Sequence, residues 1–294
     1  MWFIFAVLTS ICYATYYLCN QNSKLNANIF IVYRGFVAAL AVLPFTLFMA
    51  PSFAWPFFLI AGVQGLAVSY LDYNSYKLFQ KYGAEAVSSI QPLSVLITFV
   101  FWLLVRPAVL VSYMQNVERF ILIVAAVMAI VFAVMKYRQQ PFVLGCLKAM
   151  VPLLLIFSFI DVTNKLIMEY AGDHLLAATI YRVLIVSSIV GFINLGICHH
   201  RGIAVSEIFK KENFLAAWFL LLAPLNMMFV NFSVLYAENP AYTSAVVYLS
   251  VIWILLFNKI RQFLGFSANY HPIARKWIVL LIAATVVLIL ATAK

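Results

Sequence analysis

The chain has 294 residues, of which 66% are hydrophobic and 10% are charged, and its mean hydropathy is +1.03. Soluble domains are about half apolar and about a quarter charged, so this composition excludes an ordinary soluble protein and indicates an integral membrane protein. A net charge of +10 would suggest a nucleic-acid partner in a soluble chain. Here the basic residues lie in short loops, which fits anionic lipid headgroups, so we expect the lipid bilayer and no nucleic acid as a partner.

A spanning helix needs about 17–25 apolar residues, and ten segments of the chain meet this requirement. In chain order the predicted spans are residues 2–19, 27–49, 55–77, 84–104, 117–135, 142–168, 175–198, 214–236, 241–263 and 276–293. The first is predicted as a span rather than a removed signal, because it lacks a basic region and a small-residue cleavage site. The sequence therefore predicts an all-α membrane protein of ten transmembrane helices, with no soluble domain.

A Tyr-Arg pair occurs twice inside long apolar segments, as Tyr33-Arg34 and as Tyr181-Arg182. A guanidinium stays charged and is costly at membrane depth, so its recurrence after 148 residues (182 − 34) indicates an internal repeat. Both arginines are candidate contacts for an anion or a carboxylate. The alternative is that each reaches the nearer interface or ties helices together through backbone carbonyls.

A second pair of similar stretches supports the repeat. Residues 74–79 precede Gly83, and residues 231–236 precede Pro240, at an offset of 157 (231 − 74) that the longer loop around residues 210–213 explains. The chain then divides into halves at residues 1–138 and 139–294, each with five predicted spans. Because five is odd, the second half enters the membrane in the opposite orientation, which is a recurring architecture of transporters.

Three features match a known plan: an arginine opening the second span in Tyr33-Arg34-Gly35-Phe36, a short hairpin from Tyr82 to Leu93, and the same plan in the second half. With them the sequence resembles the drug/metabolite transporter superfamily, in particular the ten-span EamA-like permeases, over essentially its whole length. It departs from that pattern at Val105-Arg106-Pro107, where a Glu-Arg pair is common, and at Leu249, which stands where Pro92 has its match.

The resemblance implies a secondary transporter in a bacterial inner membrane that moves amino acids or related metabolites. It also implies that both termini are cytoplasmic. The charges favour the opposite orientation, because the loops after spans 1, 3, 5, 7 and 9 hold 13 of the 19 Lys and Arg residues and the other side holds 4. By the positive-inside rule those basic loops are cytoplasmic and the termini lie outside. Both orientations remain open from the sequence.

Asp161, Asn164 and Lys165 share one face of the sixth predicted span, since they are spaced by three and four residues. Asp161 is the candidate proton carrier and Lys165 a candidate substrate contact, while a structural Asp161–Lys165 ion pair is the alternative. At the repeat offset, the first half carries Tyr13, Tyr16 and Tyr17 instead. The two halves would then offer hydroxyls and charges to one shared cavity.

Other polar residues are expected to complete that cavity, among spans 1, 3, 4, 6, 8 and 9. The candidate substrate-binding residues are Tyr13, Tyr17, Arg34, Gln91, Asn164, Lys165, Arg182 and Tyr248. Further polar residues of these spans, including Ser88, Ser89, Ser244 and the amides of the third and eighth spans, are expected either in the lining or in helix packing. Asp72 has a plainer alternative, a pair with Lys77 or contact with water near the loop.

No nucleotide-binding loop, catalytic motif or metal-ligand spacing is present, so we expect no cofactor, no metal and no enzymatic activity. The four cysteines are expected to pack in the core. The predicted function is gradient-driven transport of a small polar or amphipathic metabolite by alternating access, as a monomer or homodimer. The alternatives are a membrane scaffold or assembly protein and a membrane-embedded enzyme.

Overall fold

The computed structural model describes residues 1–21, 26–49, 53–82, 87, 90–137, 144–172, 174–264 and 275–292. Within these residues the chain is helical and contains no strand. The elements are α1 (Trp2–Gln21), α2 (Ala27–Thr46), α3 (Trp55–Tyr82), α5 (Leu93–Val105), α6 (Pro107–Met114), α7 (Val117–Tyr137), α8 (Leu144–Glu169), α9 (Leu175–His200), α10 (Val205–Ile208), α11 (Lys211–Ala216), η1 (Trp218–Leu221), α12 (Leu222–Tyr236), α13 (Pro240–Val247), α14 (Ser250–Phe263) and α15 (Arg275–Thr292).

The all-α prediction is confirmed, and each predicted span overlaps at least one helix. Among the described residues, seven helices are long and apolar enough to cross a membrane, or eight if α5 and α6 count as one span bent by 99°. This supports a multi-pass membrane protein. The count of ten stays a prediction, because α1 has a short apolar stretch and α3 carries polar residues in its second half. The predicted boundary between the halves, at residue 138, lies outside the described residues.

Local sequence explains several helix boundaries. The side chain of Asn26 accepts a hydrogen bond from the backbone N–H of Asn28 and so caps the beginning of α2. Asn239 caps α13 in the same way, and Pro240 follows at the first helical position, where its missing N–H costs nothing. Pro107 likewise opens α6 directly after Arg106, which ends α5.

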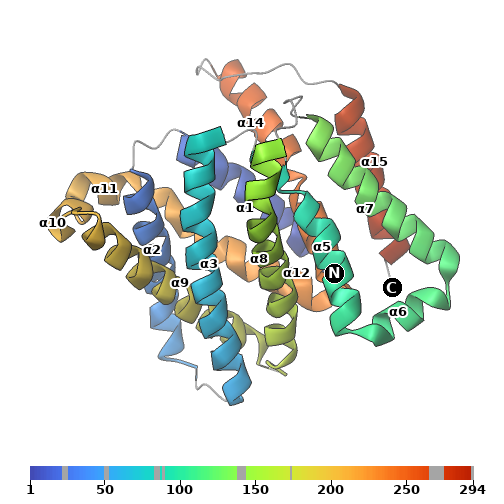
Figure 1. Ribbon diagram of the computed structural model, residues 1–294, viewed down its shortest axis with the longest axis horizontal. Helices are drawn as coiled ribbons and strands as arrows, with labels where there is room; N and C mark the ends of the chain where they lie inside the picture. The colour runs from blue at the N-terminus through green and yellow to red at the C-terminus, as the bar shows by residue number, and fades with distance from the viewer. Residues whose placement is uncertain are drawn as a thin grey trace.

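Helices α2 and α9 pack against each other more extensively than any other pair of described helices, and they run antiparallel (Figure 1). At one end, Arg201 after α9 donates to the side chain of Asn28 over 2.8 Å. At the other end, the hydroxyl of Tyr181 in α9 donates to the carbonyl of Met49 after α2, also over 2.8 Å. The two helices are therefore tied together at both ends.

Two further pairs are antiparallel. Arg119 at the beginning of α7 donates to the carbonyl of Ala291 at the end of α15, and the rings of Phe132 and Trp277 meet near the other end of this pair, 5.5 Å apart. Helix α5 packs on α13, with the indole of Trp102 near the end of α5 donating to the carbonyl of Glu238, just before α13 begins.

The two ends of the bundle differ in charge. Both chain termini lie at one end, at the lower right in Figure 1, which we call the terminal end. The ends of α3, α7, α9 and α14 and the beginnings of α8 and α15 lie at the opposite end, which we call the basic end. The described basic residues of that end are Lys77, Lys81, Lys136, Lys148, Arg201, Lys210, Lys211, Lys259, Arg261, Arg275 and Lys276.

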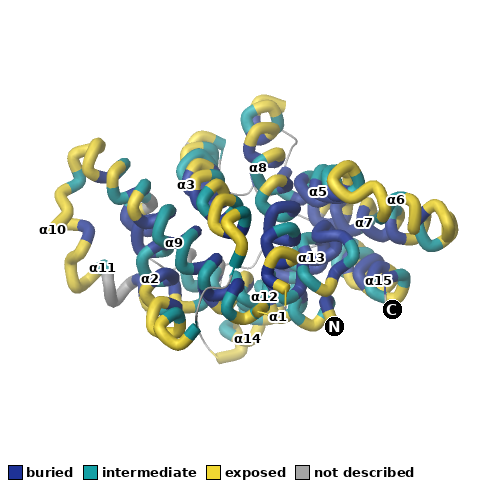
Figure 2. The backbone as a smooth tube through the Cα atoms, turned by 90° about the horizontal axis from the view of Figure 1, so that it is seen from below, coloured by how far each residue is buried: buried dark blue, intermediate teal, exposed yellow. Residues whose placement is uncertain are grey.

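One large buried cluster lies where α1, α5, α7, α13 and α15 meet, and the outer faces of many helices are exposed (Figure 2). Large apolar side chains such as Leu40 (63% exposed) and Leu290 (71% exposed) point outward. A water-soluble protein rarely exposes contiguous apolar surface on this scale. Outward-facing leucines on apolar helices are what contact with lipid requires.

Candidate functional site

A cavity of about 90 Å³ lies between α1, α2, α3, α9 and α12. Its polar lining consists of Tyr13, Tyr16, Arg34, Ser187 and Asn226, and the remaining wall is formed by small and apolar side chains. A space of this size holds several water molecules or a small ligand group.

Glycine shapes this cavity because α2 and α9 touch there through their backbones. A Cβ atom added to Gly35, which lines the cavity, would lie 2.3 Å from the backbone nitrogen of Gly191. No side chain fits at that distance, so only glycine allows the two helices to come so close. The crossing fixes Arg34 beside the contact point.

Arg34 faces the cavity from α2 and pairs with Asp72 of α3 over 2.5 Å, from Nη1 to Oδ1. The side chain of Arg34 is 33% exposed and that of Asp72 is 11% exposed. The pairing of Asp72 with Lys77 that its position in the sequence suggested is not formed. Arg34 lies seven residues after the beginning of α2, so its backbone is about 10 Å from the basic end.

Four buried polar atoms have no hydrogen-bond partner within the described part of the chain: Oδ2 of Asp72, Oγ of Ser69, Oδ1 of Asn226 and Nδ2 of Asn231. Unpaired buried polar atoms are uncommon in folded proteins because each one costs free energy. Asn226 lines the cavity, so water or a ligand there can supply its missing partner.

Arg182, the equivalent arginine in α9, has a different environment. It is 3% exposed, and it donates from Nε to Oε1 of Gln64 over 2.8 Å and from Nη1 to Oδ1 of Asn231 over 2.7 Å. Gln64 in turn donates to Asn164 and Thr163 of α8, over 3.0 and 2.8 Å. This network joins α3, α8, α9 and α12 through neutral amide and hydroxyl groups.

The tyrosines that precede the two arginines have matching roles. The hydroxyl of Tyr33 in α2 donates to the carbonyl of Ile208, in the segment that follows α9. The hydroxyl of Tyr181 in α9 donates to carbonyls of Thr46 and Met49, at the end of α2 and just after it. Each tyrosine therefore holds the segment that follows its partner helix.

The Asp161–Lys165 ion pair, which the sequence left open as the alternative, is not formed, because the two side chains bond to different helices. Oδ2 of Asp161 accepts from Ser244 of α13 over 2.6 Å and from Thr98 of α5 over 3.3 Å. This carboxylate thus links α8 to two other helices, and the guanidinium of Arg182 is close enough for its charge to reach it.

Lys165 turns the other way and caps the end of α12. Its Nζ donates to the carbonyls of Val234 and Leu235, both over 3.0 Å, and lies 5.6 Å from the centre of the Trp102 ring. The last carbonyls of a helix have no partner within the helix and attract a cation.

Gln91 and Tyr248 both lie at interruptions in the predicted spans. A turn at residues 91–92 precedes α5, and a turn at residues 248–249 separates α13 from α14. The two turns are 157 residues apart (248 − 91), which is the repeat offset read from the sequence. Both side chains are partly buried.

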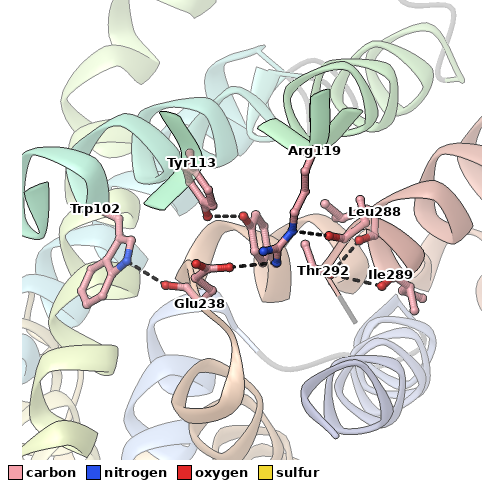
Figure 3. Close-up of polar contacts among 9 residues, drawn as sticks. Trp102, Tyr113, Arg119, Glu238, Leu288, Ile289 and Thr292 are labelled. Carbon is pink, nitrogen blue, oxygen red and sulfur yellow. Dashed lines mark hydrogen bonds and ion pairs between the residues drawn. The ribbon is translucent and has the colours of Figure 1, made fainter. Parts of the chain in front are cut away.

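The terminal end is closed by polar contacts between many helices. Arg119 donates to the carboxylate of Glu238 over 3.2 Å, while the backbone carbonyl of Glu238 accepts from Trp102 (Figure 3). Beside them, the hydroxyls of Tyr113 and Tyr242 share a buried hydrogen bond. Arg106 and Glu169 add an ion pair between the ends of α5 and α8.

Of the predicted substrate contacts, the cavity includes Tyr13 and Arg34. Asn164, Lys165 and Arg182 are buried, and Asp161 is partly buried. All four side chains are hydrogen-bonded to other helices. The side chain of Tyr17 and the residues Ser88 and Ser89 lie outside the part of the chain that is described. The expected wall of spans 1, 3, 4, 6, 8 and 9 shares α1, α3 and α12 with the observed one, to which α2 and α9 are added.

Sequence reasoning gave too little weight to Asp72. Asp72 and Arg34 lie at similar depths from the basic end. Asp72 is ten residues before the end of α3, and Arg34 is seven residues after the beginning of α2. A buried charge requires a partner at its own depth. Tyr16 and Ser187 gave no comparable signal, because hydroxyl groups in apolar helices are common.

Comparison with known proteins adds no family: no family model matches the chain, and no curated protein matches it. Among the described residues, no group of three or more His, Cys, Asp or Glu side chains is arranged to hold a metal ion. The chemistry of the site thus rests on one cavity-facing cation, hydroxyls and amides, which suit binding.

Proposed function

We propose that this chain is a secondary transporter built from two inverted five-span halves, which moves a small polar or amphipathic metabolite by alternating access. The observation that carries the proposal is the antiparallel pairing of corresponding segments: α2 with α9, α7 with α15, and the fourth predicted span with the ninth through α5 and α13. A two-fold axis in the membrane plane would place each such helix against its own counterpart in the opposite direction.

The remaining contacts support the same symmetry. Exchanging the halves turns the α1–α12 contact into the α8–α3 contact, and the α1–α14 contact into the α8–α5 contact; all four are present. Ser10 of α1 and Ser158 of α8, 148 residues apart, bond to the corresponding helices, to Trp253 of α14 and to the carbonyl of Ser94 in α5.

The matched interruptions at Gln91 and Tyr248 support a transport role. At both turns the helix tightens locally, with hydrogen bonds to the carbonyl three residues earlier, from Ser94 to Gln91 and from Val251 to Tyr248. Such a tightened stretch within a longer helix often marks a functional hinge. Because the two turns occupy corresponding positions in the two halves, they favour a protein that changes conformation over a static scaffold. The scaffold alternative gives no reason for a polar cavity with unpaired buried atoms.

The bundle has the asymmetry expected of one state of such a transporter. Arg34 and the cavity lie toward the basic end, whereas two of the three ion pairs found among the described residues, Arg106–Glu169 and Arg119–Glu238, join helices at the terminal end. We propose that the structure represents the state closed at the terminal end, and that transport requires the contacts of Arg106 and Arg119 with their acidic partners to break.

Asp161 is our candidate for energy coupling. Its carboxylate links α8 to α5, which begins after the turn at residues 91–92, and to α13, which ends at the turn at residues 248–249. Loss of its negative charge by protonation would weaken both hydrogen bonds that it accepts, because bonds to an ionised carboxylate are the stronger kind. We propose a bacterial inner membrane as the location and the EamA-like permeases as the related family.

Flux into proteoliposomes tests the proposal. Purified protein is reconstituted, and radiolabelled amino acids, organic acids, nucleosides and cofactors are offered under an imposed pH gradient. We expect saturable uptake of at least one class, stimulated by the gradient and competed by the unlabelled compound. Protein that is folded in the vesicles and yet moves none of these would favour the scaffold alternative.

A further inference from the structure

The two intramembrane arginines occupy equivalent positions in the repeat, but their side chains have different environments. The guanidinium of Arg182 is 3% exposed and held by Gln64 and Asn231. The side chain of Arg34 is 33% exposed and lines the cavity, and within the described residues its hydrogen bonding is limited to Nη1 with Asp72. Arg34 therefore has N–H groups to offer to a ligand.

The charged group in the wall of the cavity is a cation. Arg34 is the charged residue among those that line it, whereas its ion-pair partner Asp72 is not part of the wall. A guanidinium has five N–H donors in a planar fork, so it can hold Asp72 at one edge and a second carboxylate at another. An anionic ligand group also offsets the cost of keeping the arginine away from bulk water.

A second polar point lies on another wall. Asn226 in α12 lines the same cavity as Arg34, and its Oδ1 is buried and has no hydrogen-bond partner among the described residues. An amide oxygen accepts hydrogen bonds, so the ligand group beside it must be an N–H or O–H donor. Around these two points the wall is made of small or apolar residues, including Ala38, Val68 and Ala223.

We propose that the cavity binds a small organic acid, whose carboxylate is held by Arg34 and whose hydroxyl or amino group donates to Oδ1 of Asn226. Arg182 takes no part in this contact and ties the helices together. The inference rests on the proposed function, since it names the class of substrate for the same cavity.

The test uses pairs of ligands that differ in one group. Small 2-hydroxy and 2-amino acids, such as lactate and alanine, are each compared with their primary amide by thermal shift on the full-length purified protein. A second comparison sets lactate against propionate, which lacks the donor. We expect at least one acid to stabilise the protein, its amide to bind about 10- to 100-fold more weakly, and the acid without the donor to bind more weakly as well.

Variants assign the two contacts. The double variant Arg34→Gln with Asp72→Asn removes both members of the ion pair, so that no unpaired charge is buried, and it should lose the preference for acid over amide. Asn226→Leu should keep that preference and lose the difference between lactate and propionate. Tyr33→Phe is the matched control, because Tyr33 precedes Arg34 in the chain, bonds to Ile208 and does not line the cavity.

The outcomes separate this inference from the proposed function. If no acid of the set stabilises the protein more than its amide, or if the double variant keeps the preference while folded, the assignment of Arg34 is wrong. Flux of amides and acids at equal rates would overturn the inference and leave the transporter intact. Binding of acids without any flux would support the inferred ligand class and contradict the proposed transport function.

Discussion

Arg34 of α2 and Arg182 of α9 each lie seven residues after the beginning of their helix (34 − 27 and 182 − 175), yet Arg34 bonds to a carboxylate and Arg182 to two amides. Because the helices are antiparallel, the arginines lie near opposite ends of the bundle. The one near the basic end faces a cavity, and the one near the terminal end is sealed in a polar network.

The network around Arg182 makes a prediction about stability. Arg182→Lys keeps the charge but cannot donate to Gln64 and Asn231 in both directions at once. We expect the free energy of unfolding to fall by about 1–3 kcal/mol, the usual cost of a lost hydrogen bond to a charged group. Thermal unfolding in detergent measures it, with the exposed Arg201→Lys as a control expected to change stability by about 0.5 kcal/mol or less. Equal effects of the two variants would argue against a buried tie at Arg182.

The contact of Gly35 with Gly191 makes a second prediction. Gly35→Ala places a methyl group where the backbone of α9 lies, so the helices must separate, at a cost of about 1–3 kcal/mol or more. The matched control is Gly62→Ala in α3, since a Cβ at Gly62 meets nothing within 4 Å and a helical alanine is favoured over glycine. We expect a lower unfolding temperature for the first variant and an unchanged or higher one for the control. The opposite order would show that α2 and α9 do not cross at Gly35.

Energy coupling makes a third prediction. Asp161→Asn keeps an oxygen acceptor for Ser244 and Thr98, but its amide cannot take up and release a proton as a carboxylate does. In reconstituted vesicles we expect loss of uptake driven by a pH gradient, while exchange of labelled for unlabelled substrate continues. Ser244→Ala, which removes one donor and leaves the carboxylate, serves as the control and should keep gradient-driven uptake. An unchanged response of Asp161→Asn to the gradient would leave Asp161 with a structural role alone.

Orientation in the membrane makes a fourth prediction, on which the charge pattern and the family resemblance disagree. The described basic residues are concentrated at the basic end, so we expect that end in the cytoplasm. In intact cells an impermeant maleimide should label Gln115→Cys at the terminal end and spare Lys210→Cys at the basic end, in a background without the native cysteines. Labelling of Lys210→Cys alone would establish the reverse orientation that the EamA-like resemblance implies.

The Tyr-Arg repeat could be read from the sequence, and it identified the helices that matter most. Tyr33-Arg34 and Tyr181-Arg182 lie on α2 and α9, the pair with the most extensive contact. The turns at Gln91 and Tyr248 could not be read from the sequence. Once the structure shows them, their spacing proves to be the repeat offset. The partners of Asp161 and Lys165 could not be predicted, because spacing on one helix shows that two side chains can meet and says nothing of competing groups on neighbouring helices.

The sequence by itself determined that the chain is helical and belongs in a membrane, because apolar segments of spanning length have no other stable environment, and it placed four charged residues, Arg34, Asp161, Lys165 and Arg182, inside them. Only the tertiary structure decided which of these charges faces a cavity. Burial and hydrogen bonding at membrane depth depend on side chains from helices far apart in the sequence, such as Asp72 for Arg34 and Asn231 for Arg182. The close approach of Gly35 and Gly191 is likewise a property of the packed pair of helices rather than of either segment.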